Sequence, residues 1–260
     1  MGIEEIKDKI LSSDIIIGGQ VVEMRSTVIS EIYAAAGFDF ILIDQEHSAI
    51  DLSEASEIIR VARLCNIAPF IRVPEISYQC INPLLDQGVQ GIVVPRVTSR
   101  NQVIELLEMI RYYPLGRRGW GPSGACVGYS NYNASEYINH ANKSIILAIQ
   151  LESESAINDI DNIISVPGID VVIVGANDLS LTLGRPCQLN HQKIISLVNK
   201  VIDKCKKYKV VPGIAGCDMD GFCKWVSSGI RFLWVQNEVK MILSQSLQAV
   251  QKLKESERRT

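Results

Sequence analysis

Short, almost continuously apolar runs rich in Ile and Val alternate with amphipathic stretches along the whole chain. The apolar runs cover residues 14–22, 38–44, 68–73, 91–95, 145–152, 171–175, 210–215 and 232–236. A strand that is covered by helices on both faces of a parallel sheet has this pattern. The segments between them carry apolar residues at helical spacing, for example 52–64, 102–111, 156–164, 192–205 and 239–253.

Eight strands, each followed by a helix, predict a closed (β/α)8 TIM barrel, an α/β fold. A doubly wound open sheet gives the same alternation. However, no GxGxxG or Walker-type loop follows any of the apolar runs, so the main support for that alternative is missing. The sequence contains no linker, low-complexity tract or internal repeat. Residues 1–260 are therefore predicted to form a single barrel domain.

Composition excludes several classes of partner. The chain is 47% hydrophobic and 21% charged, with a net charge of −3, so it lacks the basic field that binds nucleic acid. No segment has the roughly 18 uninterrupted apolar residues of a membrane span. The seven cysteines are odd in number and include no CxxC pair, which argues against a disulfide framework and a zinc ribbon. These features favour a cytoplasmic protein with reduced thiols.

One connection is unusually long and irregular. Residues 112–133 read YYPLGRRGWGPSGACVGYSNYN, rich in Gly, Pro, Ser and Asn. Long irregular segments inside compact domains are most often lids or binding loops. The sequence does not fix whether this loop lies on the active face.

Two carboxylates follow neighbouring predicted strands. Active sites of such barrels lie at the carboxyl ends of the strands, so Glu152 and Asp178 are expected to be neighbours, with Gln150 beside them. Two carboxylates in one pocket repel each other unless a proton or a cation lies between them. Oxygen ligands favour a hard cation, Mg²⁺ or Mn²⁺. The alternative is that Asp178 only caps a helix and Glu152 only begins the next one.

His47 and Arg72 also follow predicted strands. A carboxylate near His47, from Asp44 or Glu46, suits a general acid or base at neutral pH. The alternative is a hydrogen-bonded structural histidine. Arg72 ends an apolar strand, where its planar guanidinium suits a carboxylate or an enolate oxygen. The alternative is a structural salt bridge from Arg72 to Asp44 or Glu46.

The absence of two residue patterns narrows the possible reaction mechanisms. No lysine falls at the carboxyl end of a predicted strand, so there is no good candidate for a Schiff-base aldolase. The GxSxG turn of serine hydrolases is also missing. Carbonyl chemistry assisted by a metal ion remains.

Motifs along almost the whole chain resemble the HpcH/HpaI aldolase family. They are AGFDFILIDQEH (36–47), IRVP (71–74), GVQGIVVPRV (88–97), RYYPLGRRGWGP (111–122), IQLESESA (149–156) and GANDLSLTLG (175–184), in the order of the family. The resemblance implies a barrel of the phosphoenolpyruvate/pyruvate type. It also implies a metal-dependent class II pyruvate aldolase that acts on 2-keto-3-deoxy sugar acids or 4-hydroxy-2-oxoheptanedioate-like acids.

The resemblance assigns roles at matching positions. Glu152 and Asp178 match the ligands of a divalent metal, which would be Mg²⁺, Mn²⁺ or Co²⁺. The matched catalytic residues are His47, Arg72, Asp44 and Asp86; Arg72 would hold the keto oxygen, and Asp86 would partner the histidine of a neighbouring subunit. The expected pyruvate-binding residues are Arg72, Gln150, Gly175, Ala176 and Asn177.

The resemblance further implies a homo-oligomer, a trimer or a hexamer, in which the C-terminal helix at about 239–253 is exchanged between subunits. Some positions depart from the family pattern. Ala176 stands where a proline is usual, and residues 23–27 replace a small, proline-containing loop. Met24, Arg25 and Cys126 are expected near the mouth, and they leave the aldehyde partner open.

Three functions remain at this point. The first is cleavage or formation of a 4-hydroxy-2-oxo acid through a pyruvate enolate, giving pyruvate and an aldehyde. The second is a metal-dependent decarboxylase or other carbon–carbon lyase acting on an oxaloacetate-like acid. The third is a non-catalytic metabolite-binding barrel.

Overall fold

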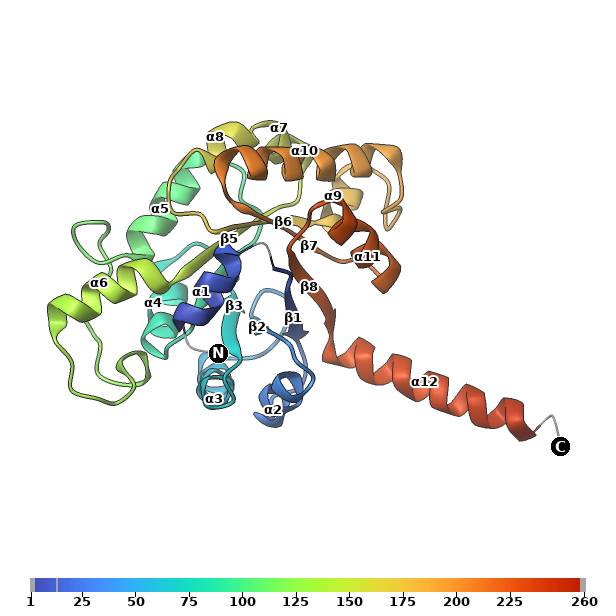
Figure 1. Ribbon diagram of the computed structural model, residues 1–260, viewed down its shortest axis with the longest axis horizontal. Helices are drawn as coiled ribbons and strands as arrows, with labels where there is room; N and C mark the ends of the chain where they lie inside the picture. Colours follow the sequence, from blue (N-terminus) through green and yellow to red (C-terminus); the bar gives the residue numbers. More distant parts are fainter. Residues whose placement is uncertain (1–2, 13, 258–260) are drawn as a thin grey trace.

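Eight parallel strands close into a barrel in the computed structural model, which describes residues 3–12 and 14–257 (Figure 1). The strands are β1 (Ile16–Val21), β2 (Phe40–Asp44), β3 (Ala68–Arg72), β4 (Gly91–Val94), β5 (Ile146–Leu151), β6 (Val171–Gly175), β7 (Val211–Ala215) and β8 (Phe232–Asn237). Each strand pairs with the next along the chain, and β8 pairs with β1. Every predicted apolar run overlaps one strand, so the predicted (β/α)8 barrel is confirmed.

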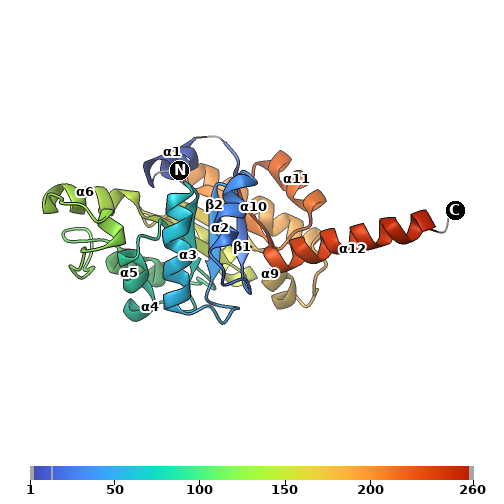
Figure 2. The same ribbon diagram turned by 90° about the horizontal axis from the view of Figure 1, so that it is seen from below.

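Helices surround the barrel (Figures 1 and 2). They are α1 (Ile3–Leu11), α2 (Val28–Ala35), α3 (Leu52–Leu64), α4 (Tyr78–Asp86), α5 (Arg100–Ile110), α6 (Ala134–Ser144), α7 (Glu154–Asn158), α8 (Ile160–Ile164), α9 (Ala176–Thr182), α10 (Gln192–Tyr208), α11 (Met219–Ser228) and α12 (Glu238–Glu257), with a 3₁₀ turn η1 (Ala125–Val127). The segment 156–164, predicted as one helix, is two, because the backbone of Asp159 leaves the helical region (φ −92°, ψ 13°).

Aromatic rings fill the barrel interior at the end where the strands begin. Phe40, Phe70 and Phe232 are fully buried, and their ring centroids lie 4.5–5.9 Å apart. Glycine makes room for them, since a Cβ on Gly18 would lie 2.1 Å from the Phe40 ring. Helix α1 adds Ile6 and Ile10 to the same apolar cluster. This end of the barrel is therefore a solid core, and the opposite end is left for a site.

Helix α12 leaves the barrel. Figure 1 shows it following β8, and both views show it projecting outward on the side of the molecule opposite α6 (Figures 1 and 2). Within the described residues, no helix is both long enough and apolar enough to cross a bilayer.

Candidate active site

The inward-facing side chains change from apolar to polar toward the carboxyl ends of the strands. In β3, Phe70 lies in the inner apolar cluster and Arg72 follows two residues later; in β2, Asp44 follows Leu42 in the same way. Alternate residues of a strand face the same side, so Asp44 and Arg72 point inward as well. The register of β2 and β3 places these two residues opposite each other. Strand periodicity thus builds a polar ring above the apolar core.

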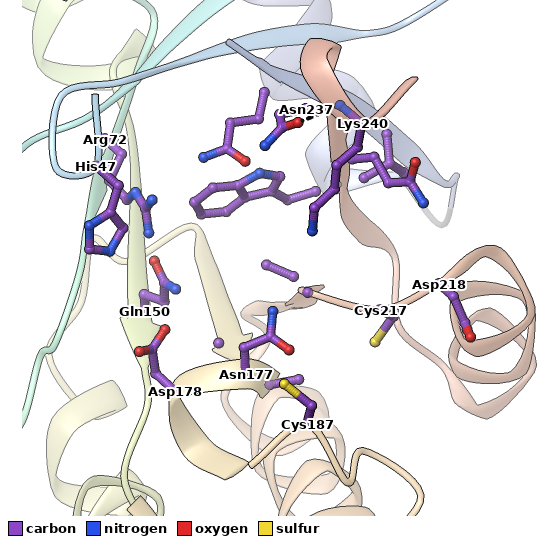
Figure 3. A pocket seen from close by; sticks show the side chains of 18 residues that line it. His47, Arg72, Gln150, Asn177, Asp178, Cys187, Cys217, Asp218, Asn237 and Lys240 are labelled. Carbon is purple, nitrogen blue, oxygen red and sulfur yellow. Dashed lines mark hydrogen bonds between the residues drawn. The ribbon is translucent and has the colours of Figure 1, made fainter. Parts of the chain in front are cut away.

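This ring opens into a cavity of about 430 Å³ (Figure 3). Seven residues predicted for the site line it, namely His47, Arg72, Gln150, Gly175, Ala176, Asn177 and Asp178. Several residues that were not predicted line it too, among them Gln20, Cys187, Cys217, Asp218, Trp234, Asn237 and Lys240. A neighbouring hollow of about 310 Å³ shares His47 and Asp178 and is also lined by Glu46, Arg96 and Glu152.

Arg72 is held by two carboxylates. Its Nε and Nη2 donate to Asp44 at 2.9 and 2.5 Å, and its Nη1 lies 3.0 Å from Glu46 Oε2. Burial by itself raises the pKa of Asp44. The hydrogen bonds and charge of Arg72, with the backbone amides of Glu46 and His47, outweigh burial and hold that pKa below its usual value. The salt-bridge alternative for Arg72 therefore describes a real contact, yet the guanidinium still lines the cavity.

Glu46 and Trp234 complete the surroundings of Arg72. Glu46 is buried between Arg72 and Arg96, whose Nη2 lies 2.8 Å from Glu46 Oε1. The Arg72 guanidinium lies 4.6 Å from the centroid of the Trp234 ring, a cation–π contact. Gln20 Nε2 donates to Asp44 at 2.7 Å from the other side. These neighbours fix the orientation of Arg72.

The Glu152 carboxylate shares its environment with a second acid. Burial and the nearby carboxylates of Asp178 and Glu46 raise the pKa of Glu152 from 4.5 to about 7. Gln150 Nε2 donates to Glu152. A Cβ at Gly175 would lie 2.6 Å from Glu152 Oε1, so only glycine allows β6 to approach this carboxylate so closely. The arrangement favours a positive charge between Glu152 and Asp178.

The donor set fits a hard divalent cation that substrate and water help to bind. In residues 3–12 and 14–257, no group of three or more His, Cys, Asp or Glu side chains is arranged to hold a metal by itself. Mg²⁺, however, is usually bound through one or two carboxylates and keeps several other oxygen ligands. Gln150 Oε1 is buried next to Glu152 and has no hydrogen-bond partner among the described residues. This oxygen is open to a ligand that enters the cavity.

His47 is open to solvent. Its imidazole is 58% exposed, and Nε2 lies 3.9 Å from Glu46 Oε1, beyond hydrogen-bond distance. The contact of His47 with Asp44 is through the backbone amide, at 3.3 Å from Oδ1. Asp86 ends α4 and pairs with Arg118 at 2.8 Å, and it lines neither hollow of its own chain. A single chain thus brings together all the predicted residues except Asp86.

The positions expected to shape the mouth lie elsewhere. Arg25 pairs with Glu54 at 3.0 Å on the surface, and Met24 packs against the outer core. The 112–133 loop, which contains Cys126, packs outside the barrel: Arg63 of α3 donates to the Ala125 carbonyl, and Gly119 donates to the Tyr78 hydroxyl of α4 at 3.2 Å. None of these residues lines the cavity. The expectation that Met24, Arg25 and Cys126 lie at the mouth does not hold within one chain.

Lysine does reach the cavity, although none ends a strand. Lys240 lies in the first turn of α12, three residues after β8, and its side chain points into the cavity (Figure 3). Attention to strand ends alone misses it, because the residue belongs to the following helix. Trp234 and Gln20 were missed for another reason: each lies inside a predicted apolar run and not at its carboxyl end.

The sequence is similar to those of known aldolases. The sequence profile of the HpcH/HpaI aldolase/citrate lyase family matches residues 22–232. The hydroxypyruvate/pyruvate aldolase of Roseobacter denitrificans is 32% identical over 91% of this chain and 92% of its own length. The 2-keto-3-deoxy-L-rhamnonate aldolase of Salmonella gallinarum is 30% identical over 84% and 81%.

A solved structure agrees with the sequence relatives. The HpcH/HpaI aldolase from Desulfitobacterium hafniense superposes with a TM-score of 0.92 at 29% identity and covers 96% of both chains. The resemblance stated from the motifs is therefore confirmed. The chain is a carbon–carbon lyase of the aldolase type and belongs to the HpcH/HpaI aldolase/citrate lyase family.

Proposed function

We propose that the protein is a metal-dependent aldolase that joins the enolate of pyruvate to an aldehyde, or reverses this reaction on a 4-hydroxy-2-oxo acid. The observation that carries the proposal is the meeting of Glu152, Asp178, Gln150 and Arg72 around one cavity. Two carboxylates beside an amide oxygen suit Mg²⁺, Mn²⁺ or Co²⁺. Relatives named for pyruvate, hydroxypyruvate and a 2-keto-3-deoxy acid support a 2-oxo acid as one of the substrates.

Glu152 and Asp178 would hold the metal, and Gln150 would contact the 2-oxo acid beside them. When bound there, a divalent cation supplies Lewis-acid stabilisation of the negative charge that develops on the keto oxygen. The backbone amides at Ala176 and Asn177 begin α9 and have no partner within that helix, so they are free to bind the carboxylate of pyruvate. Gly175 keeps this turn close to Glu152.

Arg72 would donate to the same keto oxygen. Asp44 and Glu46 do not use all of its N–H donors, and the buried pairs fix the plane of the guanidinium before substrate enters. Donors oriented in advance toward developing charge are often the largest contribution to catalysis. Asp44 and Glu46 are thus positioning residues.

His47 would move the proton of the 4-hydroxyl group, directly or through a water molecule. It lines both hollows and is exposed at the mouth, where the aldehyde enters. Among the described residues of its own chain, no carboxylate lies within hydrogen-bond distance of its imidazole. We therefore keep Asp86 of a second copy as its proposed partner.

The decisive experiment measures exchange of the pyruvate methyl protons with deuterated water, because exchange requires the enolate but no aldehyde. With Mg²⁺ or Mn²⁺ present, Glu152→Gln is expected to slow exchange by about 100-fold or more. The matched control is Glu154→Gln, which changes a surface carboxylate paired with Lys193. A chelator should abolish exchange in the wild-type protein.

Two results would sink the proposal. One is exchange that survives both the chelator and Glu152→Gln. The other is trapping of pyruvate on a lysine by borohydride, which identifies an imine and hence the Schiff-base mechanism. Release of pyruvate from oxaloacetate, measured beside release from a 4-hydroxy-2-oxo acid, separates aldolase from decarboxylase activity.

We also propose a homo-oligomer of cytoplasmic location in which residues 1–260 act as one domain. The exposed apolar side chains of α12 support the oligomer; they are Val239, Ile242, Leu243, Leu247, Val250 and Leu253. All seven cysteines are free thiols, in keeping with a reducing compartment.

A further inference from the structure

The neighbouring hollow meets the main cavity at His47. Its volume of about 310 Å³ lies just inside the range of roughly 300–1,000 Å³ that is typical of small-molecule sites. It shares His47 and Asp178 with the main cavity, and Figure 3 shows both side chains on the same side of that cavity. Arg72 and Gln150, assigned above to the 2-oxo acid, line the main cavity only. The neighbouring hollow is therefore a space that the proposed pyruvate site leaves unused.

The position of His47 directs the rest of the aldehyde toward this hollow. In condensation the methyl carbon of pyruvate bonds to the aldehyde carbon. The aldehyde oxygen takes a proton and becomes the 4-hydroxyl group, which His47 is proposed to serve. The substituent of the aldehyde must then lie beside His47 and away from the 2-oxo acid. The neighbouring hollow is the space that borders His47 outside the main cavity.

The wall of the neighbouring hollow is mainly apolar. Val97 and Leu181 line it, and Leu181 is 57% exposed. Three hydroxyl groups also line it, and each already has a partner within the chain. Thr98 Oγ1 donates to Gln102 Oε1 at 3.2 Å, Thr182 Oγ1 donates to the Leu179 carbonyl at 2.9 Å, and Ser153 Oγ accepts from the Ala156 amide at 3.2 Å. A hydroxylated substituent would lose water here for few new hydrogen bonds, so an apolar one binds better.

The guanidinium at this hollow is already neutralised. Arg96 is the only Lys or Arg among the described residues that line the hollow, and its Nη2 lies 2.8 Å from Glu46 Oε1. The other oxygen of Glu46 lies 3.0 Å from Arg72, which also pairs with Asp44. Two guanidiniums thus balance two carboxylates. A negative charge on the substituent would find no free cation here and would face Asp178.

We propose that the neighbouring hollow binds the substituent of the acceptor aldehyde, that this substituent is uncharged and apolar, aliphatic or aromatic, and that Leu181 is a specificity-determining residue for it. The inference rests on the proposed aldolase function and adds the class of the second substrate. It places the choice of acceptor on the segment after β4 and on α9, instead of on the 112–133 loop and residues 23–27.

The test compares two aldehydes of the same shape with pyruvate and Mg²⁺: glyceraldehyde, and 2-methylbutanal, in which methyl groups replace its two hydroxyls. Leu181→Asn keeps the size of the side chain but makes it polar. It is expected to lower kcat/KM for 2-methylbutanal by about 10-fold, the usual effect of losing a small apolar contact in a substrate pocket. The value for glyceraldehyde should change less than about two-fold. Leu181→Met, which stays apolar, should retain most of the preference.

The matched control is Leu64→Asn, which changes a leucine that is 77% exposed at the end of α3. It should leave both kcat/KM values unchanged. An equal loss for the two aldehydes in Leu181→Asn, or an unchanged ratio, would overturn the role of Leu181. A wild-type preference for succinic semialdehyde over 4-methylpentanal, its uncharged analogue, would overturn the assignment of an uncharged acceptor.

Two further measurements separate this inference from its neighbours. If the wild-type protein shows no exchange of pyruvate protons, the proposed function itself fails. If exchange occurs but the aldehyde ratios contradict the expectation, only the acceptor class is overturned. If Leu181→Asn changes the mass of the protein in solution and not its aldehyde preference, the neighbouring hollow is a contact between copies of the chain, which also overturns the inference.

Discussion

Glu152, a proposed metal ligand, also links the stability of the fold to pH. Its pKa is raised to about 7 because the carboxylate is buried and faces Asp178 and Glu46. A carboxyl group with a raised folded-state pKa stabilises the fold below its unfolded pKa, and this stabilisation is lost as pH rises through the folded pKa. A metal at the proposed site would compete with the proton, so metal affinity should rise through the same pH range.

The metal-free protein should therefore become less stable between pH 5 and pH 8. The shift from 4.5 to about 7 corresponds to a free energy of unfolding that falls by on the order of 3 kcal/mol, and Glu152→Gln should remove most of this slope. Urea denaturation in a chelator at several pH values measures it, with Glu154→Gln as the control. Parallel curves for wild type and Glu152→Gln would contradict the raised pKa.

At the residue scale, sequence predicts side chains that lie where strands end. Arg72 and Gln150 were found because each is a polar residue at the carboxyl end of a predicted apolar strand. Glu46 was noticed only as a neighbour of His47, and its contacts with Arg72 and Arg96 depend on the directions of three side chains that end or follow three different strands. Such contacts follow from packing and cannot be predicted from periodicity.

At the element scale, strands were easier to predict than connections. The apolar runs overlap the eight strands because burial on both faces leaves few other patterns. The loop 112–133 was expected to form a lid or binding loop, but its place on the outside of α3 and α4 depends on contacts such as Arg118 with Asp86. These contacts join residues far apart in the chain, so no local signal predicts them.

The junction of β8 and α12 depends on one buried carboxylate. Glu238 begins α12, is 2% exposed, and accepts from the backbone amides of Val22, Glu23 and Met24 at 2.6–3.1 Å. This cluster fixes the loop after β1 to the start of α12. It therefore also fixes the first turn of α12, where Lys240 lines the cavity.

Removing this carboxylate should loosen the junction. Glu238→Ala is expected to lower the free energy of unfolding by about 2 kcal/mol, since three amides lose a charged acceptor. Denaturant unfolding followed by tryptophan fluorescence measures the loss. Glu255→Ala, at an exposed site on the same helix, should cost far less. Equal losses in the two variants would show that the Glu238 contacts contribute nothing specific.

At the scale of the whole molecule, α12 is the element whose apolar face remains exposed in a single chain. Its apolar residues recur every three or four positions in a single stripe, and they are 41–71% exposed. Because this helix of 20 residues projects from the barrel, contacts within its own chain bury little of its apolar surface (Figure 1). Another copy of the chain is the partner that the proposed exchange of C-terminal helices supplies.

Leu247→Glu should dissociate the oligomer, because it places a charge in the middle of the apolar stripe. Light scattering coupled to size-exclusion chromatography should find the wild type larger than one chain and this variant close to 28.8 kDa. Gln248→Glu adds the same charge to the neighbouring, polar position of α12 and should leave the mass unchanged. A wild-type protein that is monomeric at micromolar concentration would overturn the oligomer.

If His47 depends on Asp86 of a second copy, Leu247→Glu should also lower kcat for cleavage while pyruvate proton exchange persists, since exchange relies on residues of one chain.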